Sequence, residues 1–185
     1  MDEALWAFGR GSGVISLALL TVGVVLGIVN RSGRPLPGMP RFAVALVHRN
    51  VALLASAFLV LHVATLIFDP FSKFTLVDVV VPFVGSVKPL WLGLGTVATD
   101  LVIAIVVTGL LRRRVGVRVF RFVHWFTYAM WPVALLHAIG DGTDGLSAWF
   151  LVFAVVSTAL VVGAVFWRIS ARFGETARAR QETLS

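Results

Sequence analysis

Five long apolar runs constrain this chain more than any other feature of its sequence. They cover residues 11–29, 42–68, 89–111, 122–139 and 146–167. The hydrocarbon core of a bilayer is about 30 Å thick and a helix rises about 1.5 Å per residue, so roughly 20 apolar residues suffice to cross it. A helix also pairs its own backbone polar groups, which lipid cannot do. The sequence therefore predicts an all-α membrane protein, a bundle of five transmembrane helices.

The composition agrees with this interpretation and excludes other classes. Hydrophobic residues make up 58% of the chain and charged residues 14%, against about 45–50% and 25% in ordinary soluble domains. Such a chain is neither a soluble globular domain nor intrinsically disordered. It contains no cysteine, which excludes disulfides, iron–sulfur clusters, thiolate zinc sites and cysteine nucleophiles.

The net charge of +7 marks the orientation in the membrane. Arginines gather in connections 30–41 and 111–121 and in the tail 168–185, whereas connections 69–88 and 140–145 contain four aspartates and two lysines. The positive-inside rule then places the N-terminus outside and the C-terminus in the cytoplasm. No basic stripe interleaves with aromatic residues, so nucleic acid is not an expected partner, and the arginines are expected to face anionic membrane lipid. We expect an integral protein of a bacterial plasma membrane.

The segment 70–88 is expected to be a lid on the outer face. Its apolar stretch Thr75–Val84 is about half as long as a membrane span and contains Pro82, which favours a re-entrant or interfacial segment over a sixth crossing. The tail 168–185 is expected to be cytoplasmic, and residues 1–185 to form a single transmembrane domain.

All four histidines lie in the second and fourth runs, and none lies in a connection. Ionisable residues at membrane depth are costly and are therefore functional candidates. His48 and His62 are 14 residues apart, which is about 21 Å along a helix and within about 40° of one face. His124 and His137 are 13 residues apart, about 19.5 Å.

One span separates the two histidine helices, so both run in the same direction across the membrane. His48 and His124 each follow a cytoplasmic arginine by six or seven residues, and we expect these two at one inner level. His62 and His137 are then expected at one outer level. One imidazole from each helix, at two levels, suits two non-covalent b-type haems, with each iron held between the helices.

Two details of the histidine helices need an explanation. Thirteen steps of an ideal helix leave His137 about 140° from His124, and we expect Pro132 to kink the helix and change its phase. On the other helix, the small residues Ala52 and Ala55, with Leu59, leave room for a macrocycle, although close helix packing favours small residues equally.

Three further polar residues are candidates for the site. Asp100 lies midway along the third run, where it is either a proton relay or partner of Arg49 or a histidine, or a packing acid bonded to Thr96 or Thr99. Arg49 either binds haem propionates or extends to the cytoplasmic interface, and Arg10 offers the same choice at the outer level. Both irons would be six-coordinate, so no catalytic residue is predicted.

The histidine helices resemble those of the ferric reductase-like transmembrane family, which includes ferric-chelate reductases and the membrane part of NADPH oxidases. The similarity covers most of residues 6–167, and a weaker similarity lies at Gly9–Gly13. The residues that carry it are His48–Arg49 and Leu61–His62 on one helix, and Phe122–His124 and Leu136–His137 on the other.

The resemblance implies that His48 pairs with His124 on an inner haem and His62 with His137 on an outer haem. Electrons would then cross from a cytoplasmic flavoprotein or a quinol to an outer acceptor, such as ferric chelate or a partner redox protein. About 18 residues follow Trp167, without a glycine-rich dinucleotide fingerprint. We therefore expect no flavin or nicotinamide site in this chain and a separate redox partner.

Two alternatives remain open at this point. The chain is a haem subunit dedicated to one partner oxidoreductase, or it is a transporter that uses His and Asp as a proton relay. The matched levels of the histidines disfavour the relay, because a relay does not require them.

Overall fold

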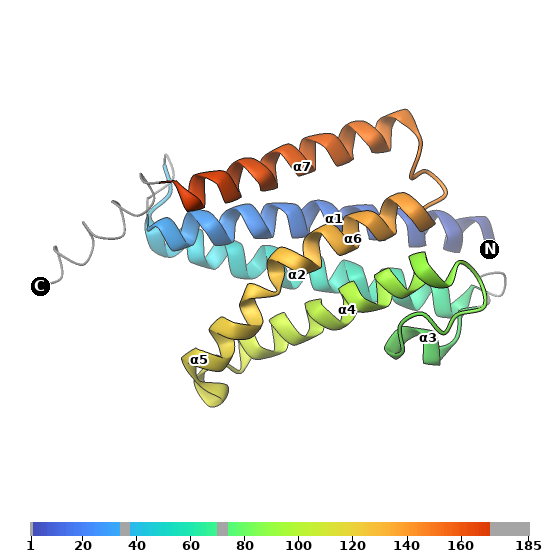
Figure 1. Cartoon of the computed structure of the whole chain (residues 1–185), viewed down its shortest axis with the longest axis horizontal. Helices are drawn as coiled ribbons and strands as arrows, with labels where there is room; N and C mark the ends of the chain where they lie inside the picture. The colour runs from blue at the N-terminus through green and yellow to red at the C-terminus, as the bar shows by residue number, and fades with distance from the viewer. Residues whose placement is uncertain (1, 34–37, 70–73, 171–185) are drawn as a thin grey trace, which may run out of the picture.

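The computed structural model describes residues 2–33, 38–69 and 74–170. These residues contain seven helices and no strand (Figure 1). The helices are α1 (Asp2–Ser32), α2 (Arg41–Phe68), α3 (Leu76–Val80), α4 (Pro89–Leu110), α5 (Arg112–Trp125), α6 (Thr127–Asp141) and α7 (Ala148–Ile169). Part of the predicted lid, residues 70–73, and most of the predicted tail, residues 171–185, lie outside the described residues.

The prediction of five membrane spans is confirmed. Helices α1, α2, α4 and α7 are each long and apolar enough to cross a bilayer, and α5 and α6 together form a fifth span over Arg112–Asp141. Helix α3 has five residues, which is too short to cross. The start of α1 and the end of α7 lie at opposite ends of the bundle (Figure 1), as an odd number of crossings requires.

Helix α1 is longer than the first apolar run. It begins at Asp2, well before Gly11. The charge that bounded the predicted run belongs to Arg10, which forms an ion pair with Asp144 and lies over the Trp6 ring at 4.1 Å. Arginine is a good helix former, so Arg10 bounds the apolar run without ending the helix.

The arginine-rich connection 111–121 forms most of α5, which Gly116 interrupts with non-helical backbone angles. Its five arginines are exposed, together with apolar Val117 and Phe122. A segment that exposes both arginines and apolar side chains suits a membrane interface. The backbone of Gly116 has φ 83°, which a residue without Cβ adopts at little cost.

The fourth span has a break between its two helices at Phe126, in addition to Pro132 inside α6. The Phe126 amide donates to the Val123 carbonyl at 3.0 Å, a bond between residues three apart that tightens the helix locally. Such a turn rotates each residue by about 120° instead of 100°. Helix α6 continues through Pro132, so the change of phase between the two histidines includes the junction of α5 and α6.

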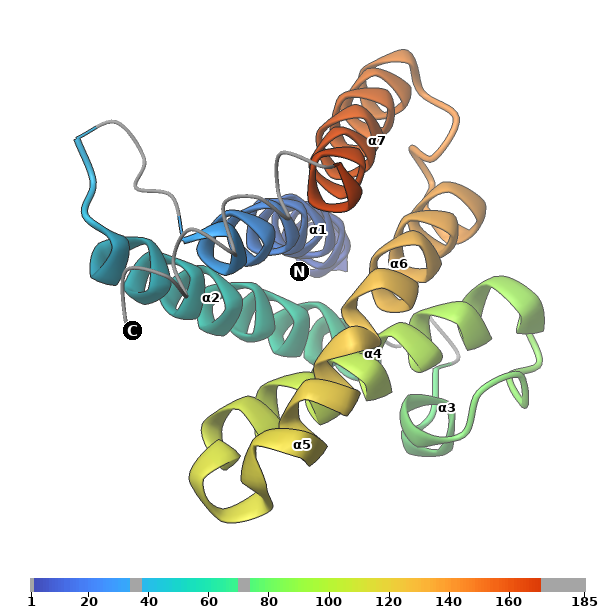
Figure 2. The ribbon, with the colours of Figure 1, turned by 60° about the vertical axis from the view of Figure 1, so that its left-hand side comes forward.

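Helix α1 lies at the centre of the bundle. It packs against α2, α6 and α7, while α4 packs against α2, α5 and α6 (Figure 2). A buried apolar cluster joins α1, α6 and α7: Leu17, Val24, Ile28, Trp131, Leu135, Phe150, Ala154 and Val161. Helices α2 and α6 thus face each other with α1 on one side and α4 on the other.

The described part of the lid, residues 74–88, packs on α4. A capping box formed by Thr75 and Asp78 begins α3, and the Thr96 hydroxyl donates to the Asp78 carbonyl at 2.6 Å. Phe83 covers Gly93, where a Cβ would lie 2.2 Å from its ring. These contacts attach the lid to one end of α4.

Candidate functional site: two histidine pairs

The four histidines form two pairs, each with one ring from α2. His48 faces His124 of α5 with ring centroids 6.3 Å apart and ring planes at 81°. His62 faces His137 of α6 with centroids 6.5 Å apart and planes at 74°. These are the two levels that the spacing along the chain predicts.

The separation of the rings leaves space for one metal ion between them. Imidazoles bound through Nε2 on opposite sides of a metal at about 2.0 Å, with each ring centre about 1.2 Å from that nitrogen, have centroids about 6.4 Å apart. Both measured separations lie close to this value. The described residues contain no group of three or more His, Asp or Glu able to hold a metal ion. Each level offers two imidazole ligands, a set that haem iron would accept.

Hydrogen bonds orient the rings of the His62–His137 pair. The Nδ1 atom of His62 lies 2.7 Å from the Gly9 carbonyl oxygen, and that of His137 lies 2.8 Å from the Trp91 carbonyl oxygen. Since a carbonyl only accepts, each Nδ1 carries the proton and donates it, a tautomer assigned here from its partner. Each Nε2 lone pair is then available to a metal.

The His48–His124 pair is held differently. The Nδ1 atoms of both rings are buried and have no hydrogen-bond partner among the described residues. Phe120 packs on His124 with ring centroids 5.0 Å apart. The Gly23 backbone of α1 lies beside His48, as the Gly9 carbonyl lies beside His62, whereas an aromatic ring packs on His124.

Glycines on the neighbouring helices provide space for the histidine rings. A Cβ on Gly13 of α1 would lie 2.9 Å from His62 Nδ1, and one on Gly27 would lie 3.2 Å from His48 Cε1. Gly13 and Gly27 are 14 residues apart, as are His48 and His62. Sequence reasoning missed this role, although the equal spacing is visible in the sequence.

The same arrangement recurs on α4 at the second histidine helix. A Cβ on Gly95 would lie 2.6 Å from His137 Cε1. Larger residues at Gly13, Gly27 or Gly95 would thus displace a histidine ring, so these glycines help determine where the rings lie.

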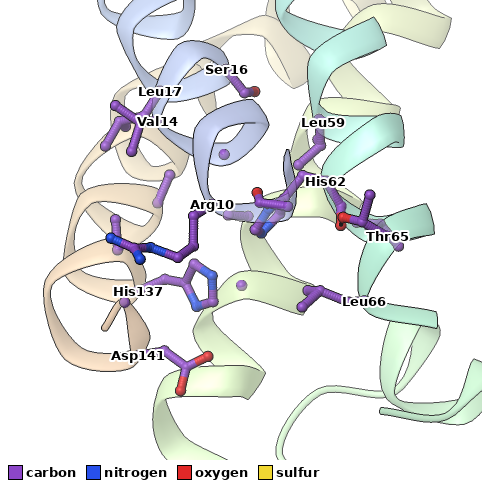
Figure 3. A pocket seen from close by; sticks show the side chains of 18 of the residues that line it. Arg10, Val14, Ser16, Leu17, Leu59, His62, Thr65, Leu66, His137 and Asp141 are labelled. Carbon is purple, nitrogen blue, oxygen red and sulfur yellow. Dashed lines mark hydrogen bonds between the residues drawn. The ribbon is translucent and has the colours of Figure 1, made fainter. Parts of the chain in front are cut away.

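A cavity of about 270 Å³ surrounds the His62–His137 pair (Figure 3). Helices α1, α2, α4 and α6 and the loop 142–145 line it, and small residues such as Gly9, Gly13 and Gly95 are among them. The ring separation fits an iron ligated by both imidazoles, and the cavity provides part of the space that a macrocycle would occupy. Of the positions considered on α2, Leu59 lines the cavity, whereas Ala55 is fully buried against α1 and accepts a bond from Ser16 at 3.0 Å.

Ionisable residues line this cavity around the two histidines. Arg10, His62, His137 and Asp141 are seen lining it in Figure 3. Arg10 is paired with Asp144, and Lys88 Nζ lies 3.7 Å from Asp141 Oδ1. The sequence-predicted candidate Arg10 is therefore beside the pair to which it was assigned.

The other two candidates lie on the protein surface. Asp100 is exposed and does not line the cavity, whereas Gly95, Thr99 and Val102 of the same helix do. Thr99 donates to the Gly95 carbonyl and not to Asp100. Arg49 is exposed beside His48. Among the described residues, the structure does not join Asp100 to Arg49 or to a histidine.

A comparison with family models identifies the class of protein. The model described as "Ferric reductase like transmembrane component" matches residues 12–135, about two thirds of the chain. The chain therefore belongs to this family, and it is a membrane component of redox chemistry. The match includes His48, His62 and His124 and ends two residues before His137. No curated protein and no solved structure matches the chain.

Proposed function

We propose that this protein is a b-type cytochrome that holds two haems and carries electrons across the membrane. The observation that carries the proposal is the pair of ring separations, 6.3 and 6.5 Å, each wide enough for one iron between two imidazoles. Haem iron, when bound there, supplies reversible one-electron chemistry. Membership of the ferric reductase-like family supports a role in membrane electron transfer.

The residues of the chain have separate roles in this proposal. His48 and His124 would hold the inner haem, and His62 and His137 the outer haem. The Gly9 and Trp91 carbonyls fix the proton on Nδ1 of the outer histidines, which directs Nε2 to the iron and increases the basicity of the ligand. Because both imidazoles of each pair would serve as iron ligands, an acceptor would receive the electron without binding iron.

Charged groups near each level would bind the haem carboxylates. Arg10 lines the outer cavity, where its guanidinium can exchange Asp144 for a propionate, since both are carboxylates. Arg49 is the corresponding candidate at the inner level. Asp100 is exposed on α4 and does not line the outer cavity, so it is not proposed as a partner of the outer histidines. It is kept only as a candidate proton relay.

The proposed direction of transfer rests on the ferric reductase-like family together with the proposed orientation. With the N-terminus outside and the C-terminus in the cytoplasm, a cytoplasmic flavoprotein or a membrane quinol would reduce the inner haem. An outer ferric chelate or redox protein would oxidise the outer haem. The single domain of residues 1–185 would thus act with a separate redox partner in a plasma membrane.

A reduced-minus-oxidised spectrum with a haem-to-protein ratio tests the proposal. We expect a b-type spectrum and two haems per chain in the purified protein. A preparation that is folded but binds no haem would reject the cytochrome and leave the proton-relay alternative. One haem per chain, unaffected by replacing either His62 or His137, would reject the two-level arrangement.

A further inference from the structure

An arginine at the end of the last helix lies in a cluster of aromatic side chains. Arg168 of α7 donates from Nη1 to the Tyr128 hydroxyl. Its guanidinium carbon lies 4.8 Å from the centre of the Trp125 ring and 5.2 Å from that of Tyr128. The two rings are themselves 5.4 Å apart. These contacts fix the position of a half-buried positive charge.

The cluster adjoins the His48–His124 level. Trp125 directly follows His124 in the chain, and Tyr128 follows it by four residues, which is about one helical turn. Arg168 is close enough to His124 for an electrostatic interaction between the two side chains. Helix α7 thus contributes a positive charge to a level whose histidines come from α2 and α5.

Among the described residues, no carboxylate balances the charge of Arg168. Its guanidinium has five N–H donors, and the described residues provide one hydrogen bond and no carboxylate within ion-pair distance. Arg10 at the other level differs, because Asp144 neutralises it. A half-buried guanidinium held in place without an anion is a binding site for one.

We propose that Arg168 binds a carboxylate of the inner haem and raises the reduction potential of that haem. This inference rests on the proposed function. The two propionates are the anionic groups that a haem b brings to this level, and the planar guanidinium matches a carboxylate in two parallel hydrogen bonds. One-electron reduction adds a negative charge at the iron, and a nearby fixed cation stabilises that charge.

Variants that hold a single haem provide the test. In the His62→Ala background the inner haem remains, and in the His48→Ala background the outer haem remains. Arg168→Gln should change the reduction equilibrium of the inner haem about tenfold towards the oxidised form, a decrease of about 59 mV for one electron. The outer haem should keep its potential. Arg168→Lys retains the positive charge but loses the paired N–H donors of the guanidinium, so it should give a smaller decrease in potential than Arg168→Gln.

Two controls separate this effect from a general loss of charge or of structure. Arg114→Gln removes an exposed arginine of α5 and should leave both potentials unchanged. Tyr128→Phe removes the hydroxyl that positions Arg168 and should lower the inner potential by less than Arg168→Gln does. It also provides the test if Arg168→Gln does not fold.

Esterified haem identifies the anion. When the inner site is loaded with haem dimethyl ester, Arg168→Gln should no longer change the potential. A decrease in potential that persists with the ester would overturn the proposal, because Arg168 would then act on the iron through space without binding a propionate. A decrease seen only in vesicles containing phosphatidylglycerol would overturn it as well, because Arg168 would then bind lipid headgroups. Bound haem with an unchanged potential would reject this inference alone, whereas a folded protein that binds no haem would reject the proposed function as well.

Discussion

Replacing Gly13 by alanine tests whether α1 determines the position of a haem ligand. The added Cβ would lie 2.9 Å from His62 Nδ1 and 3.0 Å from Cε1. Ordinary contacts begin near 3.4 Å, so the ring must retreat by about 0.5 Å. The movement also disturbs the 2.7 Å bond from Nδ1 to the Gly9 carbonyl. The perturbation therefore acts on the orientation of the ligand and leaves its chemical identity unchanged.

The expected magnitude follows from the role of that hydrogen bond. Removing a group that orients a metal-bound histidine typically weakens binding 10–100-fold, which corresponds to about 1.4–2.8 kcal/mol. Alanine in place of glycine also favours the helix by about 1 kcal/mol. Gly11→Ala, two residues earlier on α1, provides the matched control, because nothing lies within 4 Å of its added Cβ and it gains the same helix preference.

Haem titration of the two apoproteins, read by absorbance, measures the effect. Gly13→Ala should bind the outer haem 10–100-fold more weakly than Gly11→Ala does, with equal affinity for the inner haem. Equal outer affinities in the two variants would refute the steric reasoning. Loss of the inner haem in Gly13→Ala would show that the contact has been assigned to the wrong level.

Three further predictions concern other parts of the structure. His48→Ala and His124→Ala should each remove the same haem, halving the haem-to-protein ratio, and haem loss from different levels would disprove the pairing. Trp131→Phe removes the 2.9 Å bond from the indole N–H to the Thr21 hydroxyl and should lower the free energy of unfolding by about 1 kcal/mol. Thermal unfolding of the double variant should show that Thr21→Val adds little to the loss of unfolding free energy caused by Trp131→Phe. Fully additive losses would show that the two side chains do not interact. Asp78→Asn weakens the capping box of α3 by about 1 kcal/mol, so limited proteolysis should cut residues 74–88 faster, while an unchanged rate would show that packing on α4 alone holds the lid.

The sequence predicts the five spans and the pairing of the histidines for simple physical reasons. A bilayer requires runs of about 20 apolar residues, and five such runs are visible in the chain. The 14- and 13-residue spacings on two helices that run in the same direction require matched levels. Neither inference depends on how the side chains pack.

Features that depend on packing were not predictable. The break at Phe126 reflects one choice of hydrogen bond, whereas Pro132 was the visible candidate in the sequence. Gly13 and Gly27 have a role only because α1 lies against α2, and no local pattern shows that. Arg168 lies 44 residues from His124 in the chain, and the packing of α7 brings its charge to that histidine.

The equal 14-residue intervals on α1 and α2 restrict insertions and deletions in this chain. One residue inserted between Gly13 and Gly27 would rotate one glycine about 100° relative to the other and shift it about 1.5 Å. One of the two histidine rings would then lose the space that its glycine provides, and a change in loop length could not restore it. The separation of the two histidine levels is therefore set by the pitch of the helix, and under the proposed function this pitch would also set the electron-tunnelling distance. Length changes should be tolerated in the connections but not between the paired positions.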